Sequence, residues 1–295
     1  MQRDKMERQE ETREMQDRLA RMEALLMQHL GIRPHVPPTP RTPPSPVTER
    51  YGPQSDDHPG EATMAASDDL EVKLIGKWSS PFAVRPRIAL NLKSIEYEYL
   101  NENYLIAKSD LLLKSNPVYK KVPVLLHRGR PICESLVILQ YIDEQWRHGP
   151  SILPSNPYDR AIARFWAAYI DDKLAPAMLG MKAEREEAKA EAMEKMKAEM
   201  EVMEKVFKDL SRGGGFFGGE EVGLVDIVLG SFLAAVRVFE SVKGEKVIDE
   251  EKTPGLVGWA QRFCAHVAVR DVLPETHKLL EYAKKAFFIK PLVDK

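Results

Sequence analysis

The chain has 295 residues, of which 43% are hydrophobic and 30% charged, a composition typical of a globular protein with room for two domains. A formal net charge of −2 gives no electrostatic reason to expect nucleic acid or a membrane surface as a partner. Cys133 and Cys264 suggest no disulfide framework and fit a reducing compartment, and the seven histidines lack the spacing of a metal site. No apolar run approaches the roughly 18 residues of a membrane-spanning helix.

The first 67 residues are predicted to be an N-terminal extension, a short helix followed by a disordered linker. Residues 34–59 contain nine prolines, which suit an extended spacer rather than a packed core. Met64 precedes small and acidic residues and resembles an initiator methionine, with the residues before it as an extension. The preceding helix carries a heptad stripe of only about two heptads, so we expect it to be solvated and partly formed. The stripe comprises Met15, Leu19, Met22 and Leu26.

Residues 70–148 change period repeatedly and predict a small α/β domain. The order β-α-β-α-β-β-α indicates a mixed four-stranded sheet with helices on its faces. The predicted strands are 71–76, 97–102 and two within 122–135, and the predicted helices are 81–93, 111–117 and 134–146.

A proline-rich linker at 149–157 separates this domain from residues 158–290, which predict an all-helical bundle. A methionine stripe in the second of its helices is expected to be core rather than a ligand site. The glycine-rich residues 213–223 are predicted to be a flexible connection. The predicted helices are 158–181, 184–211, 224–243, 254–268 and 273–288.

The first candidate for chemistry is the serine before Pro81 in "KWSSPF". Proline suits the first position of a helix, so Ser80 is predicted to be the N-cap, with its hydroxyl at the positive end of the helix dipole. Capping a helix would by itself explain this serine. Residues later in the domain favour a role for Ser80 in a binding site as well.

Those residues are the Val-Pro of "KKVPVLL" and the Glu-Ser of "PICES". In a thioredoxin-like fold the proline at this place is usually cis, which leaves the backbone of Val122 able to pair with an extended peptide. Glu134 can hold an ammonium group, and Ser135 at a helix N-terminus can hold a carboxylate. A small peptide with a free amino-acid end, its reactive group pointing at Ser80, would satisfy all of these groups.

Glutathione is such a peptide, and residues 70–172 resemble a plant glutathione transferase, most closely the tau class. The resemblance rests on several stretches, and "FFGGEEVGLVDIVLG" resembles the approach to the core helix of the family's second domain, where Asp226 would be a buried capping residue. The stretches are "VKLIGKWSSPF", "IALNLKSIEYEYLNE", "SDLLLKSNPVYKKVPVLLHRGRPICESLVILQYIDEQW" and "ILPSNPYDRAIARFWAAYIDDK".

The resemblance implies a thioredoxin-like domain followed by a helical domain, in a cytosolic homodimer that uses glutathione as co-substrate and no other cofactor. Ser80 would be the catalytic serine, whose hydroxyl stabilises the glutathione thiolate. Ser79 would be a loop residue, and Phe82 would help to wall the pocket for the electrophile. The glutathione-binding residues would be Lys108, Lys121, Val122, Glu134 and Ser135.

Two stretches depart from the family's pattern. Pro86 lies inside the predicted first helix, where it removes the hydrogen bond to the carbonyl of Phe82 and predicts a kink near Ser80. Residues 171–187 diverge from the usual helix of the electrophile pocket, so no pocket residue is assigned there.

We expect an enzyme that joins glutathione to hydrophobic electrophiles, as in detoxification and stress responses. A non-catalytic carrier of hydrophobic ligands is the alternative, because intact glutathione contacts do not exclude it. A thiol transferase or dehydroascorbate reductase would need a cysteine in place of Ser80, and Cys133 is expected to be a packing residue. An interaction role for the N-terminal arm is the remaining possibility.

Overall fold

The computed structural model describes residues 72–103, 107–181, 183 and 185–288, of which 286–288 as backbone only. The chain divides into two units, Met1–Ala62 and Thr63–Lys295, and all the described residues belong to the second. The predicted heptad helix, proline-rich linker and start at Met64 therefore lie outside the described residues.

The first part of the described chain has the predicted order β-α-β-α-β-β-α. The sheet is mixed, with strand order β2-β1-β3-β4: β1 and β2 are parallel, and β3 is antiparallel to both β1 and β4. This confirms the thioredoxin-like topology. The elements are β1 (Val72–Gly76), α2 (Pro81–Leu92), β2 (Glu98–Asn101), α3 (Asp110–Ser115), β3 (Val124–His127), β4 (Arg130–Cys133) and α4 (Ser135–Gln145).

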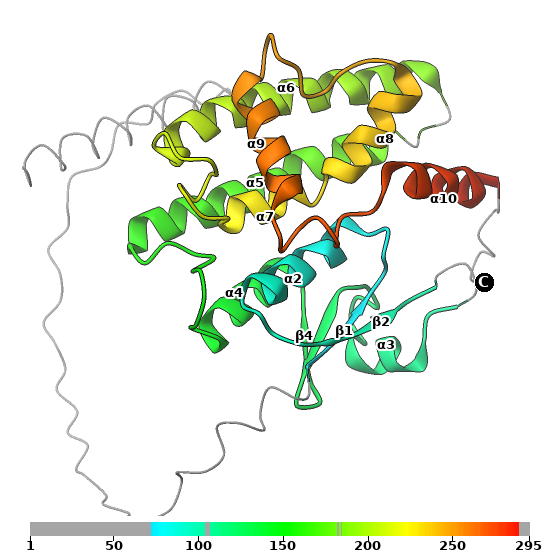
Figure 1. The fold of residues 1–295 in the computed structure, drawn as a ribbon. Coiled ribbons are helices and arrows are strands. Elements are labelled where there is room, and N and C mark those ends of the chain that lie inside the picture. The colour runs from blue at the N-terminus through cyan, green and yellow to red at the C-terminus, as the bar shows by residue number, and fades with distance from the viewer. Residues whose placement is uncertain (1–71, 104–106, 182, 184, 289–295) are drawn as a thin grey trace, which may run out of the picture. The chain divides into compact units, whose positions relative to one another are not determined.

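The sheet buries both of its faces, because successive side chains along a strand point to opposite sides. On one face Ile75 and Val124 form a buried cluster with Leu112 of α3. On the other face α2 and α4 pack against the strands and against each other. Figure 1 shows α2 between the strands and the helices of the second part of the chain. The N-terminus of α2 is thereby placed where the two parts meet.

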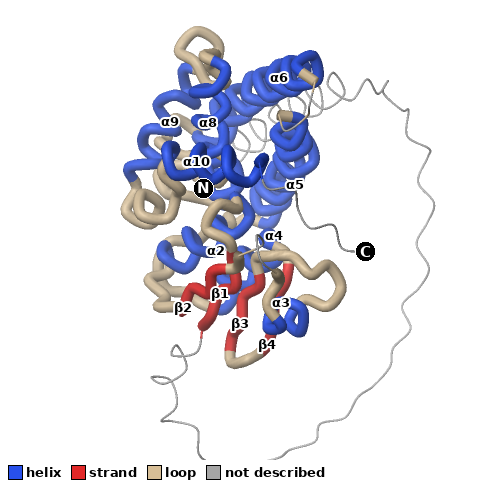
Figure 2. The backbone as a smooth tube through the Cα atoms, turned by 90° about the vertical axis from the view of Figure 1, so that its right-hand side faces the viewer, coloured by secondary structure: helices blue, strands red, loops and turns tan. Residues whose placement is uncertain are grey.

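In the described residues of the second part, the elements that pack together are helices joined by loops, which confirms the all-α domain (Figure 2). The predicted methionine stripe is core, because Met193, Met196, Met200 and Met203 are buried. Unbranched methionine side chains adapt to irregular space in a core, here where α6 packs against other helices of this domain. The elements are α5 (Pro157–Gly180), α6 (Glu186–Ser211), α7 (Leu224–Gly230), α8 (Leu233–Lys243), α9 (Pro254–Ala265) and α10 (Thr276–Phe288).

One helix prediction is wrong: residues 224–243 form two helices, α7 and α8, rather than one. The Ser231 hydroxyl donates to the carbonyl of Val228 at 2.7 Å, a backward bond that bends helices. Gly230 lies so close to the ring of Phe263 that a Cβ there would be 2.1 Å from a ring carbon. Only glycine therefore fits at position 230, where the chain lies against Phe263 of α9.

The predicted flexible connection, residues 213–223, is held by hydrogen bonds to Asp226. This buried carboxylate, in the first turn of α7, accepts from the backbone N–H groups of Phe217, Gly218 and Gly223 at 2.9–3.0 Å. It also accepts from Trp259 Nε1 at 2.7 Å. The predicted capping role of Asp226 is thus present in the structure.

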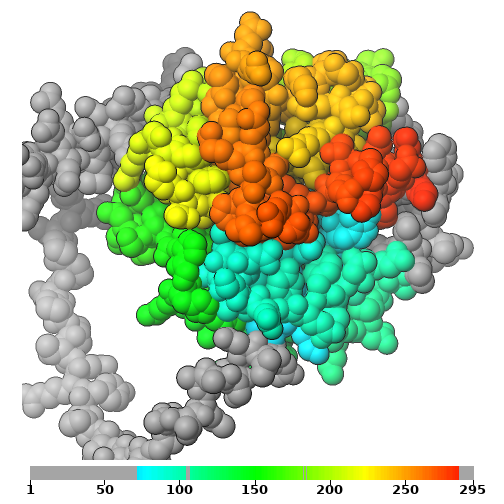
Figure 3. All heavy atoms as spheres, viewed as in Figure 1, coloured from blue at the N-terminus to red at the C-terminus, as the bar shows by residue number. Residues whose placement is uncertain are grey.

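The two parts of this unit are in direct contact. Figure 3 shows the orange residues at and after α9 packed against the cyan residues of the first domain. Two hydrogen bonds cross there, from Asn91 Nδ2 to the carbonyl of Ala268 at 3.1 Å and from Arg87 to the carbonyl of Val272 at 3.4 Å. In the described part of the chain, no helix is both long and apolar enough to cross a membrane.

Candidate functional site

The sheet register places the ends of four strands side by side. Ile75 of β1 is paired with Val124 of β3, which is paired in turn with Cys133 of β4. Gly76 of β1 is paired with Asn101 of β2. The segments that carry the predicted contacts all leave the sheet at this edge. In sheet order they are the chain after β2 (Lys108), the loop after β1 (Ser80), the chain before β3 (Val122) and the chain after β4 (Glu134 and Ser135).

Ser80 is the N-cap of α2, and Pro81 is the first residue of that helix, as predicted. Its backbone N–H donates to the carbonyl of Lys77 at 2.9 Å, and its own carbonyl accepts from Ala83 and Val84 at 3.1 Å. Within this described helix terminus, however, the Ser80 hydroxyl makes no capping hydrogen bond. Helix capping therefore does not account for the hydroxyl. Ser79 lies in the turn before it, as expected for a loop residue.

The loop before Ser80 also contacts the last helix of the described chain. The rings of Trp78 and Tyr282 of α10 meet edge to face with centroids 5.4 Å apart. The ammonium of Lys77 lies 4.9 Å from the centroid of the same tyrosine ring. α10 therefore lies beside the loop that carries the candidate serine.

The Val122–Pro123 peptide bond is cis, which confirms that prediction. The turn that precedes it is organised by Asn116, a buried polar residue that the sequence analysis did not single out. Its side chain donates to the carbonyl of Lys121 at 3.0 Å and accepts from the N–H of Tyr119 at 3.1 Å. Asn116 thus fixes the backbone on which Lys121 and Val122 lie.

Glu134 and Ser135 begin α4. Glu134 is exposed and adopts a positive φ of 69°, a conformation that L-residues rarely take and that is frequent at binding sites. Ser135 is buried, and its hydroxyl accepts a hydrogen bond from Arg85 at 3.1 Å. One residue of the pair faces solvent and the other is tied into the interior.

Arg85 is the centre of a buried polar network that the sequence analysis missed. Its guanidinium is fully buried and binds both carboxylate oxygens of Asp171 on α5, at 2.5 and 2.8 Å. It also donates to the hydroxyls of Ser135 and Ser231, and it lies over the rings of Phe82 and Phe232. This residue therefore joins the first turn of α4 to the second domain.

Two features of the sequence could have indicated this network: Arg85 lies among apolar residues of an amphipathic helix, and Asp171 lies on the apolar side of another. Neither feature predicts that the two side chains meet, because they are 86 positions apart. The neighbouring Pro86 does not end α2, which runs without interruption from Pro81 to Leu92.

The remaining predicted residues lie at the same edge or beside it. Lys108 and Lys121 are exposed, and Lys108 directly precedes Ser109, the N-cap of α3. Phe82 is half-buried in the first turn of α2, and its ring meets Phe232 edge to face at 5.8 Å. No observation tests the roles of these residues, which stay predictions.

Cys133 lies at the end of β4 and packs against the Ile75 cluster. Burial, and secondarily the charge of Glu134, raise the pKa of its thiol. A raised pKa disfavours the thiolate that redox chemistry needs, so packing explains this residue better. Among the residues that the structure describes, no cluster of three or more His, Cys, Asp or Glu side chains could hold a metal ion.

Two family models match the chain. One describes the N-terminal domain of glutathione S-transferases and matches residues 70–144, and the other describes the C-terminal domain and matches residues 160–266. A curated relative, glutathione S-transferase U17 of Arabidopsis thaliana, is 55% identical over 226 residues, which cover 76% of this chain and 98% of the relative. A probable glutathione S-transferase of rice is 52% identical over 74% of this chain and 94% of its own length.

Solved structures agree with these relatives. A tau-class glutathione S-transferase from mango is 56% identical, with a TM-score of 0.70 over 74% of this chain and 99% of the mango chain. A rice glutathione transferase solved in complex with glutathione is 39% identical, with a TM-score of 0.67 over 73% of this chain and 97% of its own.

Proposed function

Because the chain belongs to the glutathione S-transferase family, and within it to the tau class, we propose that it joins the thiol of glutathione to hydrophobic electrophiles. The relatives are named for this activity, and the match covers nearly their whole length. The rice neighbour was solved with glutathione.

The observation that carries the proposal is the order of the strand ends. Adjacent strands lie about 4.8 Å apart, so four strand ends span about 14 Å, and an extended tripeptide is about 10 Å long. Across the edge the order is Lys108, Ser80, Val122 and then Glu134 with Ser135. This is the order in which glutathione presents its glycine carboxylate, its cysteine and its γ-glutamyl group.

In the proposed reaction the Ser80 hydroxyl donates a hydrogen bond to the glutathione sulfur. The positive end of the α2 dipole favours the same negative charge, so both lower the pKa of the thiol and raise the thiolate fraction. The thiolate attacks the electrophilic carbon, a carbon–sulfur bond forms, and the leaving group departs with the bonding electron pair. The thiol proton is released to solvent.

The other predicted residues hold the two ends of the tripeptide. The carboxylate of Glu134 would bind the ammonium of the γ-glutamyl group, and the Ser135 hydroxyl and the α4 N-terminus would bind its carboxylate. Arg85 donates a hydrogen bond to the Ser135 hydroxyl and so holds it in place. Lys108 and Lys121 would attract the glycine carboxylate as point charges. The half-buried ring of Phe82 would line the adjoining electrophile pocket.

Ser80→Ala tests the assignment of the catalytic serine. The measurement is the steady-state conjugation of glutathione to chlorodinitrobenzene by the full chain and by the variant. We expect kcat/KM to fall at least about a hundredfold, because a preorganised donor to the developing charge is lost. Ser79→Ala, one residue earlier in the turn, is the matched control and should keep its activity.

Two results would contradict the proposal. A Ser80→Ala variant as active as the parent would remove Ser80 from the reaction. A parent chain that binds glutathione but converts no electrophile from a panel would favour the carrier of hydrophobic ligands instead.

We also propose a homodimer in the cytoplasm. Large apolar side chains are exposed on α3, on the turn after it, on α4 and on α5, where a second copy would cover them. They are Leu111, Val118, Tyr119, Val137, Phe165 and Leu179. Both cysteines carry free thiols, which fits a reducing compartment.

The domain limits 70–148 and 158–290, joined by a linker at 149–157, are a proposal that the positions of the two family models support.

A further inference from the structure

Two polar residues at the end of β2 lie at the functional edge without belonging to the predicted site. Asn101 is the last residue of the strand, and Glu102 follows it. Asn101 is exposed, but Glu102 is buried, with 7% of its surface accessible. Burying a carboxylate costs free energy unless hydrogen-bond donors compensate for the lost water, so the donors that Glu102 binds indicate its role.

Asn101 holds the loop that carries Ser80. Its side-chain oxygen accepts a hydrogen bond from the backbone N–H of Trp78 at 3.0 Å, two residues before the serine. Next to it, the N–H of Glu102 donates to the carbonyl of Gly76 at 2.7 Å and so extends the pairing of β1 with β2. The start of the Ser80 loop is therefore bonded to the end of β2 at two successive points.

Glu102 holds the chain beside Lys108. Its carboxylate accepts from the backbone N–H of Ser109 at 3.1 Å and from the Ser109 hydroxyl at 2.5 Å. The same hydroxyl accepts from the N–H of Leu112 and so caps α3. Residue 109 is thus fixed to both β2 and α3, and Lys108 is the residue immediately before it.

We propose that Asn101 and Glu102 are positioning residues that set Ser80 and Lys108 at the spacing of the glutathione sulfur and the glycine carboxylate, an inference that rests on the proposed function. The two residues are adjacent in the chain, and each reaches a different half of the site. The end of β2 is therefore the rigid element common to both halves.

Glu102→Gln tests the half near Lys108. The glutamine loses one of the two acceptor oxygens that hold Ser109, so Lys108 is held less firmly. We expect KM for glutathione to rise about fivefold with kcat within about twofold, since a contact made equally before and in the transition state is weakened. Glu98→Gln is the matched control, because Glu98 lies at the other end of β2, where it pairs with Lys73.

A second substrate separates positioning from a general loss of structure. γ-Glutamylcysteine lacks the glycine carboxylate, so it should bind the parent chain more weakly than glutathione does. Glu102→Gln should then cause no further rise in KM for this dipeptide. If Glu102→Gln fails to fold, Ser109→Ala, which removes the hydroxyl bond from the other side, should show the same dependence on the substrate.

Asn101→Ala tests the half near Ser80. We expect kcat/KM to fall about tenfold and the pKa of the bound glutathione thiol, read from thiolate absorbance near 240 nm, to rise toward that of free glutathione. Asn101→Asp keeps an oxygen acceptor for the Trp78 N–H and should restore most of the activity.

Equal losses with glutathione and with γ-glutamylcysteine would overturn the assignment of Glu102. An unchanged thiol pKa in Asn101→Ala would overturn that of Asn101. If the parent chain binds glutathione but catalyses nothing, the proposed function fails while the inference is still decided, by calorimetric titration of the two ligands and by the same absorbance measurement.

Discussion

Arg85 shows at the scale of a single residue how a buried charge can be used to join two domains. Removing a guanidinium from water is costly, and here it is compensated by a bidentate carboxylate, two hydroxyls and two aromatic rings. No other side chain offers five donors in one plane, so lysine could not replace it.

Arg85→Ala should lower the free energy of unfolding by about 3 kcal/mol, because it leaves Asp171 partly buried without its partner. Urea denaturation followed by circular dichroism measures this change. Arg147→Ala, which removes an exposed arginine just after α4, is the control and should change stability by less than about 0.5 kcal/mol. Equal losses in the two variants would mean that the network around Arg85 does not stabilise the fold.

Asp226 predicts a pH dependence. Burial raises the pKa of its carboxyl group to about 6, although its four hydrogen-bond donors oppose the rise. The folded state therefore binds this proton more tightly than the unfolded chain, whose aspartates titrate near 3.9. The contribution of Asp226 to stability is fully present below about pH 4 and decreases as pH rises to about 6.

Urea denaturation between pH 4 and pH 7 measures this dependence in the parent chain and in Asp226→Asn. Subtracting the variant's free energy of unfolding from that of the parent isolates the titration of Asp226. This difference should fall as pH rises through the window. A difference that does not change with pH would show that the carboxyl group titrates alike in both states.

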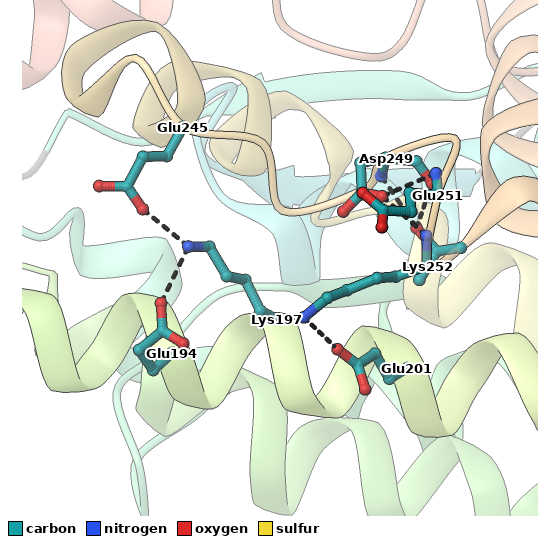
Figure 4. Close-up of polar contacts among 8 residues, drawn as sticks. Glu194, Lys197, Glu201, Glu245, Asp249, Glu251 and Lys252 are labelled. Carbon is teal, nitrogen blue, oxygen red and sulfur yellow. Dashed lines mark hydrogen bonds and ion pairs between the residues drawn. The ribbon is translucent and has the colours of Figure 1, made fainter.

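At the scale of elements, α6 binds the chain around the start of α9 by two kinds of contact. Glu204 is buried and accepts from the N–H groups of Gly255 and Leu256 at 3.1 and 2.8 Å, so it caps α9 from another helix. Exposed ion pairs also link α6 to the chain between α8 and α9, and Figure 4 shows Lys252 with Glu201 and Lys197 between Glu194 and Glu245.

Glu204→Gln should lower the free energy of unfolding by about 1–2 kcal/mol, because a charged cap is lost at the positive end of the α9 dipole. Glu201→Gln on the same helix is the matched control. Its ion pair with Lys252 is exposed and screened by salt, so no measurable change is expected. Thermal denaturation of the two variants at low and high salt compares their losses of stability. A larger loss for Glu201→Gln than for Glu204→Gln would contradict the prediction.

At the scale of the whole molecule, we expect the exposed apolar side chains to decide the state of association. Tyr119→Glu and Phe165→Glu each place a charge on the proposed dimer face, where burial would leave it uncompensated. Light scattering should therefore show the parent at twice the chain mass of 33.5 kDa and these variants at the mass of one chain. Val242→Glu, which alters an exposed valine of α8, is the control. A monomeric parent would contradict the dimer.

Apart from the break between α7 and α8, the order of the elements, and with it the fold class, could be predicted from local signals in the sequence. Hydrophobic period, the proline at the start of α2 and the turn between β3 and β4 are local signals, and the structure agrees with each. The expectation of a thioredoxin-like fold predicted the cis bond before Pro123, and the resemblance to a family predicted the buried cap at Asp226. The resemblance to a family supplied the roles of the predicted site residues.

Which polar groups meet could not be predicted from the sequence, because their partners lie far away along the chain. Arg85 reaches partners that are 50, 86 and 146 residues away, and Glu204 caps a helix 51 residues further on. The ring of Phe263 packs directly against Gly230 at the end of α7, and the path of residues 213–223 depends on Asp226. Periodicity predicts that a side chain is buried, but its partner comes from a distant part of the chain, and only packing brings the two together.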